Sequence, residues 1–400
     1  MQRREWLQWA GLSAGLGRAG ALLAAADGLG EAAARSGRGF GFSIDPSYAG
    51  DTPVAALLAR HATVIAPENV MKWCAIEGIL GGRDFARADA VVATAAGLGA
   101  RLRGHTLAWH QMVPARLTLA SSASFVKAQT AHLQELATRY AGRIHTWDVL
   151  NEVVNPDDGR PDGLRESVLS HLWGIERYPE LFELARAADP QAQLAYNDYG
   201  LEQDEPWCEL RRQATLRLLA QWLQRKTPID VLGLQAHLDL SRKFSAEKLG
   251  RFFDEVSAMG LTIQITELDV RDALFVGDVA ARDAAVAALY RDFVQACVSH
   301  PAVEMLVMWN VTDADTWLNR AWQGQHRADG APCGPRCLTA RASRSLRSTQ
   351  CCTAWHKPAR PSRASRASTD GATGRRVSDQ RFLSQRYAIL AGRVNKHPTP

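Results

Sequence analysis

Short apolar runs alternate with longer amphipathic segments from residue 40 to about residue 320. The longer segments, such as 125–140 and 209–224, have apolar residues every three or four positions, a spacing typical of α-helices. The short runs predict strands, and this alternation predicts βαβ units with a parallel sheet. The predicted strands are 40–44, 62–66, 101–106, 144–150, 193–197, 230–236, 262–267 and 305–310.

Eight such units within about 280 residues predict an α/β fold, a (β/α)8 TIM barrel, because these barrels typically take about 250 residues. A doubly wound open sheet is the competing fold. It is disfavoured because no Gly-x-Gly-x-x-Gly turn follows a predicted strand. Residues 36–320 are therefore predicted to form one barrel domain.

Composition and charge separate this body from the C-terminal segment. The chain has 46% hydrophobic and 22% charged residues, as globular proteins do, and no run of 18 or more apolar residues predicts a membrane-spanning helix. From Ala321 onward there are 15 Lys and Arg against 3 Asp and Glu, whereas the first 320 residues carry a net charge of −7. We expect the acidic body to have no nucleic-acid or membrane partner and to be a monomer.

Cysteine usage does not indicate a disulfide scaffold or a metal site. Cys74, Cys208 and Cys297 are isolated in the body. Four further cysteines lie in the C-terminal segment, but neighbouring histidines do not complete a known zinc spacing. We therefore predict no bound metal.

Residues 1–35 are typical of an export signal. Arg3 and Arg4 precede a weakly apolar stretch over 10–26, and the alanines at 24–26 and 32–34 offer cleavage sites. Paired arginines with mild apolarity indicate a twin-arginine signal and predict a periplasmic or extracellular protein. The alternative is an amphipathic N-terminal helix of the mature fold.

Polar and aromatic residues stand at or just after the carboxyl ends of the predicted strands. A (β/α)8 barrel builds its active site at this face, from the loops that follow the strands. A structural role alone does not easily explain such residues at seven strand ends. They are Glu68, Asn69, His105, Trp109, His110, Asn151, Glu152, Asn197, Asp198, Tyr199, Gln235, His237, Glu267, Asp269 and Trp309.

Two of these residues, Glu152 and Glu267, are suited to acid–base and nucleophilic chemistry. They end the fourth and seventh predicted strands, so we expect them to face each other across the barrel mouth. Paired carboxylates that flank a glycosidic bond act as acid and nucleophile. A lone glutamate at a strand end is equally well explained by an ion pair, so the hypothesis depends on the pair and its neighbours.

The neighbours have matching chemistry. Asn151 can hydrogen-bond a sugar hydroxyl next to the reacting carbon. His237 can hold Glu267 ionised, and Asp269 would orient that histidine. Flat faces on which sugar rings can stack, or alternatively barrel-core contacts, come from Trp109, Trp309 and Trp317.

These residues lie in motifs that resemble those of family 10 glycoside hydrolases, which are endo-1,4-β-xylanases. The motifs occur in the family's order and spacing over residues 40–320. Ala236 and Asn310 depart from the pattern, because each stands where the family usually has glycine. The matching motifs are 67–73 (PENVMKW), 103–110 (RGHTLAWH), 147–152 (WDVLNE), 196–199 (YNDY), 233–237 (GLQAH), 265–270 (ITELDV) and 309–318 (WNVTDADTWL).

The resemblance implies a retaining double displacement, with Glu152 as general acid/base and Glu267 as nucleophile, and no metal or organic cofactor. It implies xylan or xylo-oligosaccharide as substrate, with Tyr199 stacking on the aglycone side. Asn151, His237 and Asp269 would support the catalytic pair. The substrate-binding residues that it implies are Glu68, Asn69, Lys72, His105, Trp109, Asn151, Gln235, His237, Trp309 and Trp317.

The resemblance ends near Leu318, before the loop and final helix that close the family's barrel. The closing helix is therefore expected to be missing or replaced by residues 321–400, which are rich in Arg, Ser, Ala and Pro. Three explanations are open: a disordered basic linker, a nucleic-acid-binding tail, or out-of-frame translation. The abrupt change of composition favours the last.

Two rival functions follow. An incomplete barrel predicts a non-catalytic or misfolded relic that at most binds xylan. A complete barrel with different subsite contacts predicts a glycosidase for another β-1,4-glycan, such as cellulose or mannan.

Overall fold

The computed structural model describes residues 28–50, 52–78, 81–313 and 316–319. The greater part of the predicted export signal and all of the basic C-terminal segment lie outside these ranges, as does the place of the closing helix. The predictions for those segments therefore stay predictions. Within the described ranges, no helix is long and apolar enough to cross a membrane.

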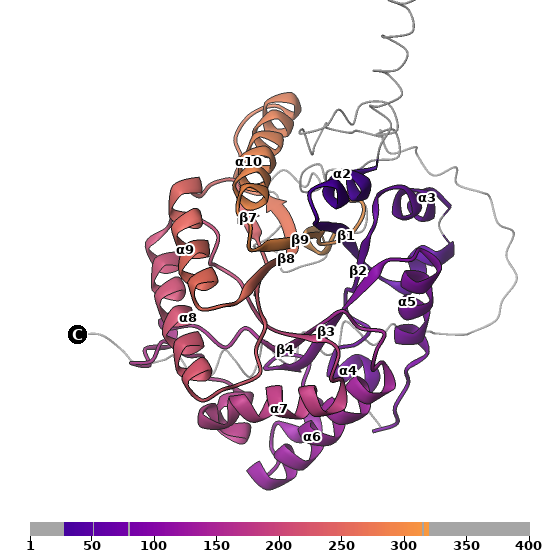
Figure 1. The fold of residues 1–400 in the computed structure, drawn as a ribbon, viewed down its shortest axis with the longest axis vertical. Helices are drawn as coiled ribbons and strands as arrows, with labels where there is room; N and C mark the ends of the chain where they lie inside the picture. Colours follow the sequence, from indigo (N-terminus) through magenta and orange to yellow (C-terminus); the bar gives the residue numbers. More distant parts are fainter. Residues whose placement is uncertain (1–27, 51, 79–80, 314–315, 320–400) are drawn as a thin grey trace, which may run out of the picture. The chain divides into compact units, whose positions relative to one another are not determined.

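Eight parallel strands close into a ring, as the sequence predicts (Figure 1). The hydrogen-bonded order is β1, β2, β3, β4, β5, β6, β8, β9, and β9 pairs with β1 to close the barrel. This closure excludes the open doubly wound sheet. The barrel strands are β1 (Gly39–Ile44), β2 (Val64–Pro67), β3 (Arg101–Trp109), β4 (Thr146–Asn151), β5 (Gln193–Asp198), β6 (Val231–Leu234), β8 (Thr262–Arg271) and β9 (Val303–Met308).

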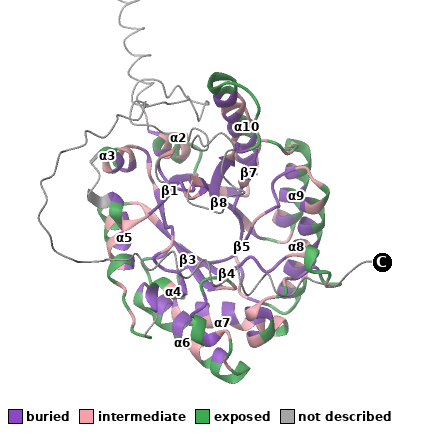
Figure 2. Ribbon diagram, turned by 180° about the vertical axis from the view of Figure 1, so that it is seen from behind, coloured by how far each residue is buried: buried purple, intermediate pink, exposed green. Residues whose placement is uncertain are grey.

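Helices surround the ring and turn their buried sides toward it (Figure 2). The predicted helices 125–140 and 209–224 are confirmed as α6 and α8. The described helices are α2 (Leu29–Arg35), α3 (Thr52–His61), α4 (Trp73–Ile76), α5 (Ala86–Gly97), α6 (Ser122–Arg139), α7 (Tyr178–Ala188), α8 (Pro206–Gln224), α9 (Ala246–Ala258) and α10 (Val279–Ser299).

Helix α2 lies within the stretch that the sequence assigns to the export signal. The backbone N–H of Leu29 donates to His61 Nδ1 at 3.1 Å, and this histidine is buried at the end of α3. A Cβ atom at Gly28 would come within 1.9 Å of the Arg60 carbonyl oxygen, so only glycine permits this approach. Residues 28–35 therefore pack on the barrel, which is the alternative given above for this part of the N-terminus.

Strands β3 and β8 extend three and four residues beyond their predicted ends. Strand β3 continues to Trp109, because Ala108 and Trp109 still pair with β4. Strand β8 continues to Arg271, because a short additional strand, β7 (His237–Asp239), pairs with Asp269–Arg271. Glu267 therefore lies within the seventh barrel strand rather than at its end, which corrects the predicted boundary.

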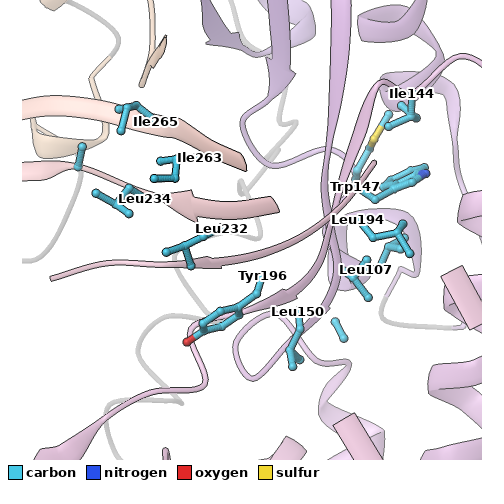
Figure 3. Packing of buried hydrophobic residues seen from close by; sticks show 14 of the residues in the cluster. Leu107, Ile144, Trp147, Leu150, Leu194, Tyr196, Leu232, Leu234, Ile263 and Ile265 are labelled. Atoms are coloured by element: carbon cyan, nitrogen blue, oxygen red, sulfur yellow. The ribbon is translucent and has the colours of Figure 1, made fainter. Parts of the chain in front are cut away.

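The main core fills the layer between the strands and the helices. Trp147 of β4 lies beside Leu107 of β3 and Leu194 of β5, and Tyr196 of β5 lies near Leu232 of β6 (Figure 3). A second, smaller cluster joins β2 to β9 and consists of Val64, Ala66, Met305 and Val307. Both clusters hold the strands whose carboxyl ends carry the predicted site.

Candidate active site

The predicted site residues gather at the carboxyl ends of the strands. Asn151 is the last residue of β4 and Glu152 follows it, while Gln235 directly follows β6. Both glutamates are buried, with 9% of Glu152 and 5% of Glu267 exposed. Tight burial of two carboxylates is costly unless polar groups surround them, so their hydrogen-bond partners decide what they can do.

Amide side chains connect the two glutamates. Asn151 Nδ2 donates to Glu152 Oε1 at 3.2 Å, and Gln235 Nε2 donates to the same oxygen at 2.9 Å. Asn197, the next-to-last residue of β5, donates to Asn151 Oδ1 and to Glu267 Oε1, both at 2.9 Å. The two carboxylates therefore belong to one hydrogen-bonded cluster on β4, β5, β6 and β8.

His237 and Asp269 hold Glu267 in its ionised form. His237 Nδ1 lies 2.9 Å from Asp269 Oδ1, and its Nε2 lies 3.3 Å from Glu267 Oε2. Burial lowers the pKa of His237, but the charge and hydrogen bond of Asp269, together with Glu267, raise it well above its ordinary value. The histidine is therefore protonated at neutral pH and donates to both carboxylates.

The pKa of Glu267 falls from 4.5 to about 2. Burial by itself would raise this pKa, but the hydrogen bond from His237 and the positive charges of His105, His237 and Lys72 outweigh burial. A buried carboxylate that stays ionised is a competent nucleophile.

Lys72 lies between carboxylates and aromatic rings. Its Nζ donates to Asn69 Oδ1 at 2.9 Å and lies 4.8 Å from the centroid of the Trp109 ring and 5.9 Å from that of Trp309. Burial lowers the pKa of Lys72, while Glu267, Glu68 and Glu152 oppose that shift. Lys72, Trp109 and Trp309, which follow or end the second, third and eighth barrel strands, thus lie close together, and the Lys72 charge acts on both catalytic glutamates.

Trp317 reaches the same cluster from the segment after β9. Its indole Nε1 donates to Asp269 Oδ2 at 2.6 Å, and its ring centroid lies 5.0 Å from that of His237. Trp309, which directly follows β9, is 5% exposed, whereas Trp109 and Trp317 are partly exposed. The latter two therefore present aromatic surface at the site.

Tyr199 lies on the side of Glu152, held by two arginines. Arg165 Nη2 donates to Tyr199 Oη at 2.8 Å, and its Nε donates to the backbone carbonyl of Glu152 at 2.7 Å. The Arg211 guanidinium lies 4.0 Å from the centroid of the Tyr199 ring. Arg165 therefore joins the backbone of Glu152, which has a φ of 60°, to the predicted aglycone residue.

The buried ion pair of Arg103 and Asp148 holds the His105 ring in place. Asp148 Oδ2 lies 2.9 Å from His105 Nδ1, and Arg103 binds Asp148 through both terminal nitrogens at 2.6 and 3.1 Å. Arg103 Nε also donates to Gln264 of β8 at 2.8 Å. This network fixes the ring of His105, one of the groups that lower the pKa of Glu267.

The site has the parts of a two-carboxylate hydrolase. Glu267 is held ionised by the hydrogen bond from His237, whereas the Glu152 carboxylate accepts hydrogen bonds from two neutral amides, those of Asn151 and Gln235. Among the described residues, no group of three or more His, Cys, Asp and Glu side chains is placed to hold a metal ion. The two carboxylates in these unequal settings match the roles of nucleophile and acid/base in glycoside hydrolysis.

Comparisons with known proteins agree with this geometry. The model of glycosyl hydrolase family 10 matches residues 28–332. The chain belongs to glycosyl hydrolase family 10. Endo-1,4-beta-xylanase 3 of Hypocrea jecorina is 32% identical over 279 residues, which cover 70% of this chain and 74% of the relative. Endo-1,4-beta-xylanase C of Phanerodontia chrysosporium is 32% identical over 301 residues, which cover 74% of this chain and 71% of the relative.

Solved structures of family 10 enzymes share the fold. Xylanase 10B from Thermotoga petrophila RKU-1, solved in complex with xylobiose, superposes with a TM-score of 0.68 at 26% identity. The match covers 74% of this chain and 89% of that structure. The predicted (β/α)8 barrel is thus confirmed by the closed ring and by its structural relatives.

The two departures from the family 10 pattern have a backbone explanation. Ala236 has a φ of 61° and Asn310 a φ of 77°, both in the left-handed region that glycine adopts without strain. Asparagine tolerates this region better than other non-glycine residues, and alanine does so poorly. Both side chains are fully buried, so each adds volume beside the site.

The sequence places Asn197 at a strand end without giving it a role, and it does not single out Arg165. Asn197 lies in a recognised motif and at a strand end, but nothing in the sequence shows that one amide joins Asn151 to Glu267. Arg165 lies in the long connection between β4 and β5, without a strand-end position to single it out. Its contact with Glu152 exists only after this connection folds back on β4.

Proposed function

We propose that this protein is an endo-1,4-β-xylanase that hydrolyses xylan or xylo-oligosaccharides with retention of configuration. The observation that carries the proposal is the joined pair of unequal carboxylates, Glu152 and Glu267, in a family 10 barrel. The similarity of the chain to endo-1,4-beta-xylanases and to a xylanase solved in complex with xylobiose supports the substrate class.

Each step of the reaction has a group to perform it. Glu267 attacks the anomeric carbon and forms a glycosyl-enzyme, while Glu152 protonates the departing sugar oxygen. Glu152 then takes a proton from a water molecule that attacks the glycosyl-enzyme and releases the sugar. Protonated His237 and Lys72 stabilise the charge of Glu267, and Asn151 is placed to bind the sugar hydroxyl beside the reacting carbon.

We also propose the substrate-binding roles of the surrounding residues. Sugar rings stack on Trp109, Trp309 and Trp317, with Tyr199 on the aglycone side. Polar contacts to xylose units come from Glu68, Asn69, Lys72, His105 and Gln235. The protein works as a monomer after export through a twin-arginine signal, and cleavage of that signal before Gly28 would leave α2 in the mature fold.

The substrate test compares release of reducing ends from xylan, cellulose and mannan by the purified protein. The proposal requires cleavage of xylan into oligosaccharides of several lengths, with the other two glycans nearly untouched. Preference for cellulose or mannan would establish the rival glycosidase. A folded protein that binds xylan without cleaving it would establish the non-catalytic relic.

Two variants test the catalytic roles. Glu267→Ala is expected to abolish turnover, and azide should restore cleavage of an activated xyloside with inverted product, because the anion replaces the missing nucleophile.

Glu152→Ala is expected to impair xylan cleavage far more than the first step on an aryl xylobioside with an acidic phenol, which departs unaided. A burst of phenol marks the accumulating glycosyl-enzyme. Equal losses on both substrates, without a burst, would contradict the role of Glu152.

A further inference from the structure

The side chain of Asn310 makes one contact that glycine at this position could not make. Asn310 directly follows Trp309 and is fully buried. Its backbone N–H donates to Ser43 Oγ of β1 at 2.7 Å, and its side-chain Oδ1 accepts the backbone N–H of Trp317 at 3.1 Å. The side chain therefore joins the end of β9 to a residue seven positions further along the chain.

Trp317 connects Asn310 to the proposed nucleophile, Glu267, through two further side chains. Its indole donates to Asp269, which lies 2.9 Å from His237, and the other nitrogen of His237 lies 3.3 Å from Glu267. A continuous series of hydrogen bonds thus runs from Asn310 to the carboxylate.

We propose that Asn310 is a positioning residue, whose side chain holds Trp317 so that the indole fixes Asp269, His237 and Glu267. The inference rests on the proposed function and adds a residue that departs from the family pattern. Glycine adopts the left-handed backbone conformation of this position without strain, and asparagine adopts it at a modest cost. In this chain the side chain thereby supplies a hydrogen bond to the segment that carries Trp317.

The consequence for chemistry follows from the geometry. Without the Asn310 contact, the indole of Trp317 is held less firmly, and Asp269 loses part of its support. His237 then hydrogen-bonds Glu267 less well, so the carboxylate protonates at a higher pH. The charged and titratable groups that act on Glu267 include His237, His105 and Lys72. Asp269 in turn contacts His237, and Glu68 and Glu152 act on Lys72.

Asn310→Gly is the direct test, because glycine keeps the backbone conformation and removes only the side chain. The measurements are kcat and KM for an aryl xylobioside as a function of pH. We expect KM to rise about fivefold, the effect of losing one hydrogen bond. We expect the acidic limb of kcat/KM to move up by roughly half a pH unit or more. Unchanged KM and an unchanged limb would overturn the proposal.

A double-mutant cycle with Trp317→Phe tests the route of the effect. Phenylalanine keeps an aromatic ring but lacks the N–H that donates to Asp269, so Trp317→Phe should itself raise the acidic limb. Asn310→Gly should then add little in the Trp317→Phe background. The proposed route would be overturned if the effects of the two substitutions were fully additive. It would also be overturned if Trp317→Phe left the acidic limb of kcat/KM at the wild-type pH.

Thr316→Val is the matched control. It removes the hydrogen bond from the Leu318 N–H to Thr316 Oγ1 in the same segment, and should lower the melting temperature without moving the acidic limb. A limb shift in this variant equal to that of Asn310→Gly would assign the effect to general loosening and overturn the proposal. A wild-type protein that cleaves neither xylan nor the aryl xylobioside would instead defeat the proposed function itself.

Discussion

At the scale of single residues, the surroundings of Glu267 set the chemistry. The carboxylate is buried, yet its pKa falls to about 2 because hydrogen bonding and positive charge outweigh burial. Since this folded-state value lies below the ordinary value of 4.5, the ionised form stabilises the fold above about pH 4.5. This contribution is lost as the pH falls toward 2.

His237→Asn is predicted to raise the pKa of Glu267. The substitution removes the positive charge and the hydrogen bond from Nε2, so the acidic limb of kcat/KM should move upward by about one pH unit or more. The pH profile on an aryl xylobioside measures the shift. His171→Asn, at an exposed histidine, is the control and should leave the limb in place. A limb in His237→Asn that coincides with that of the wild type would contradict the role given to the histidine.

At the scale of elements, local backbone rules set where several helices end. Helix α8 ends in a Schellman motif, because Lys226 N–H donates to Leu223 O and Thr227 N–H donates to Trp222 O. Lys226 has a φ of 58°, which glycine adopts with less strain. Helices α5 and α9 have glycine at the corresponding position, Gly99 and Gly260.

Lys226→Gly is therefore predicted to stabilise the protein. The side chain is exposed, so little contact is lost, and relief of the left-handed strain should add about 0.5–1 kcal/mol to the free energy of unfolding. Thermal unfolding should show a rise in Tm of roughly 2 °C. Lys226→Ala keeps the strain and should show no gain. Equal stabilities of the two variants would mean that strain at this position is negligible.

At the scale of the whole molecule, closure of the barrel depends on the covering of β9 and β1. Phe40 and Phe42 of β1, with Leu306 and Met308 of β9, belong to the core layer outside the ring. The family 10 model reaches residue 332, beyond the last described residue. Exposing about 400 Å² of such apolar surface would cost about 10 kcal/mol, as much as the stability of a whole domain.

Replacement of residues 321–400 by the closing segment of a family 10 relative is predicted to raise both Tm and soluble yield, Tm by more than about 5 °C. The added helix would cover the apolar side of β9 and β1. A Gly/Ser linker of the same length is the control and should give no rise. Unchanged Tm and yield after the swap would show that the native segment already covers these strands, which would contradict the out-of-frame hypothesis.

The apolar periodicity of the chain was enough to predict the barrel and the place of its site. Parallel strands bring their carboxyl ends to one face, so residues such as Glu152 and Gln235 could be assigned to a common rim without coordinates. Their identities, in the order of a known family, then indicated the reaction. These features are local, because they depend on residue type and on short spacings along the chain.

Contacts between distant segments were decided only by the tertiary structure. The extension of β8 past Glu267 depends on pairing with β7, about thirty residues earlier in the chain. Asn197 joins Asn151 to Glu267, and Asn310 holds Trp317, only because the closed ring and its loops bring these side chains within hydrogen-bond distance. Periodicity reports which face of an element is buried, whereas hydrogen bonds between elements depend on distances that only the folded chain sets.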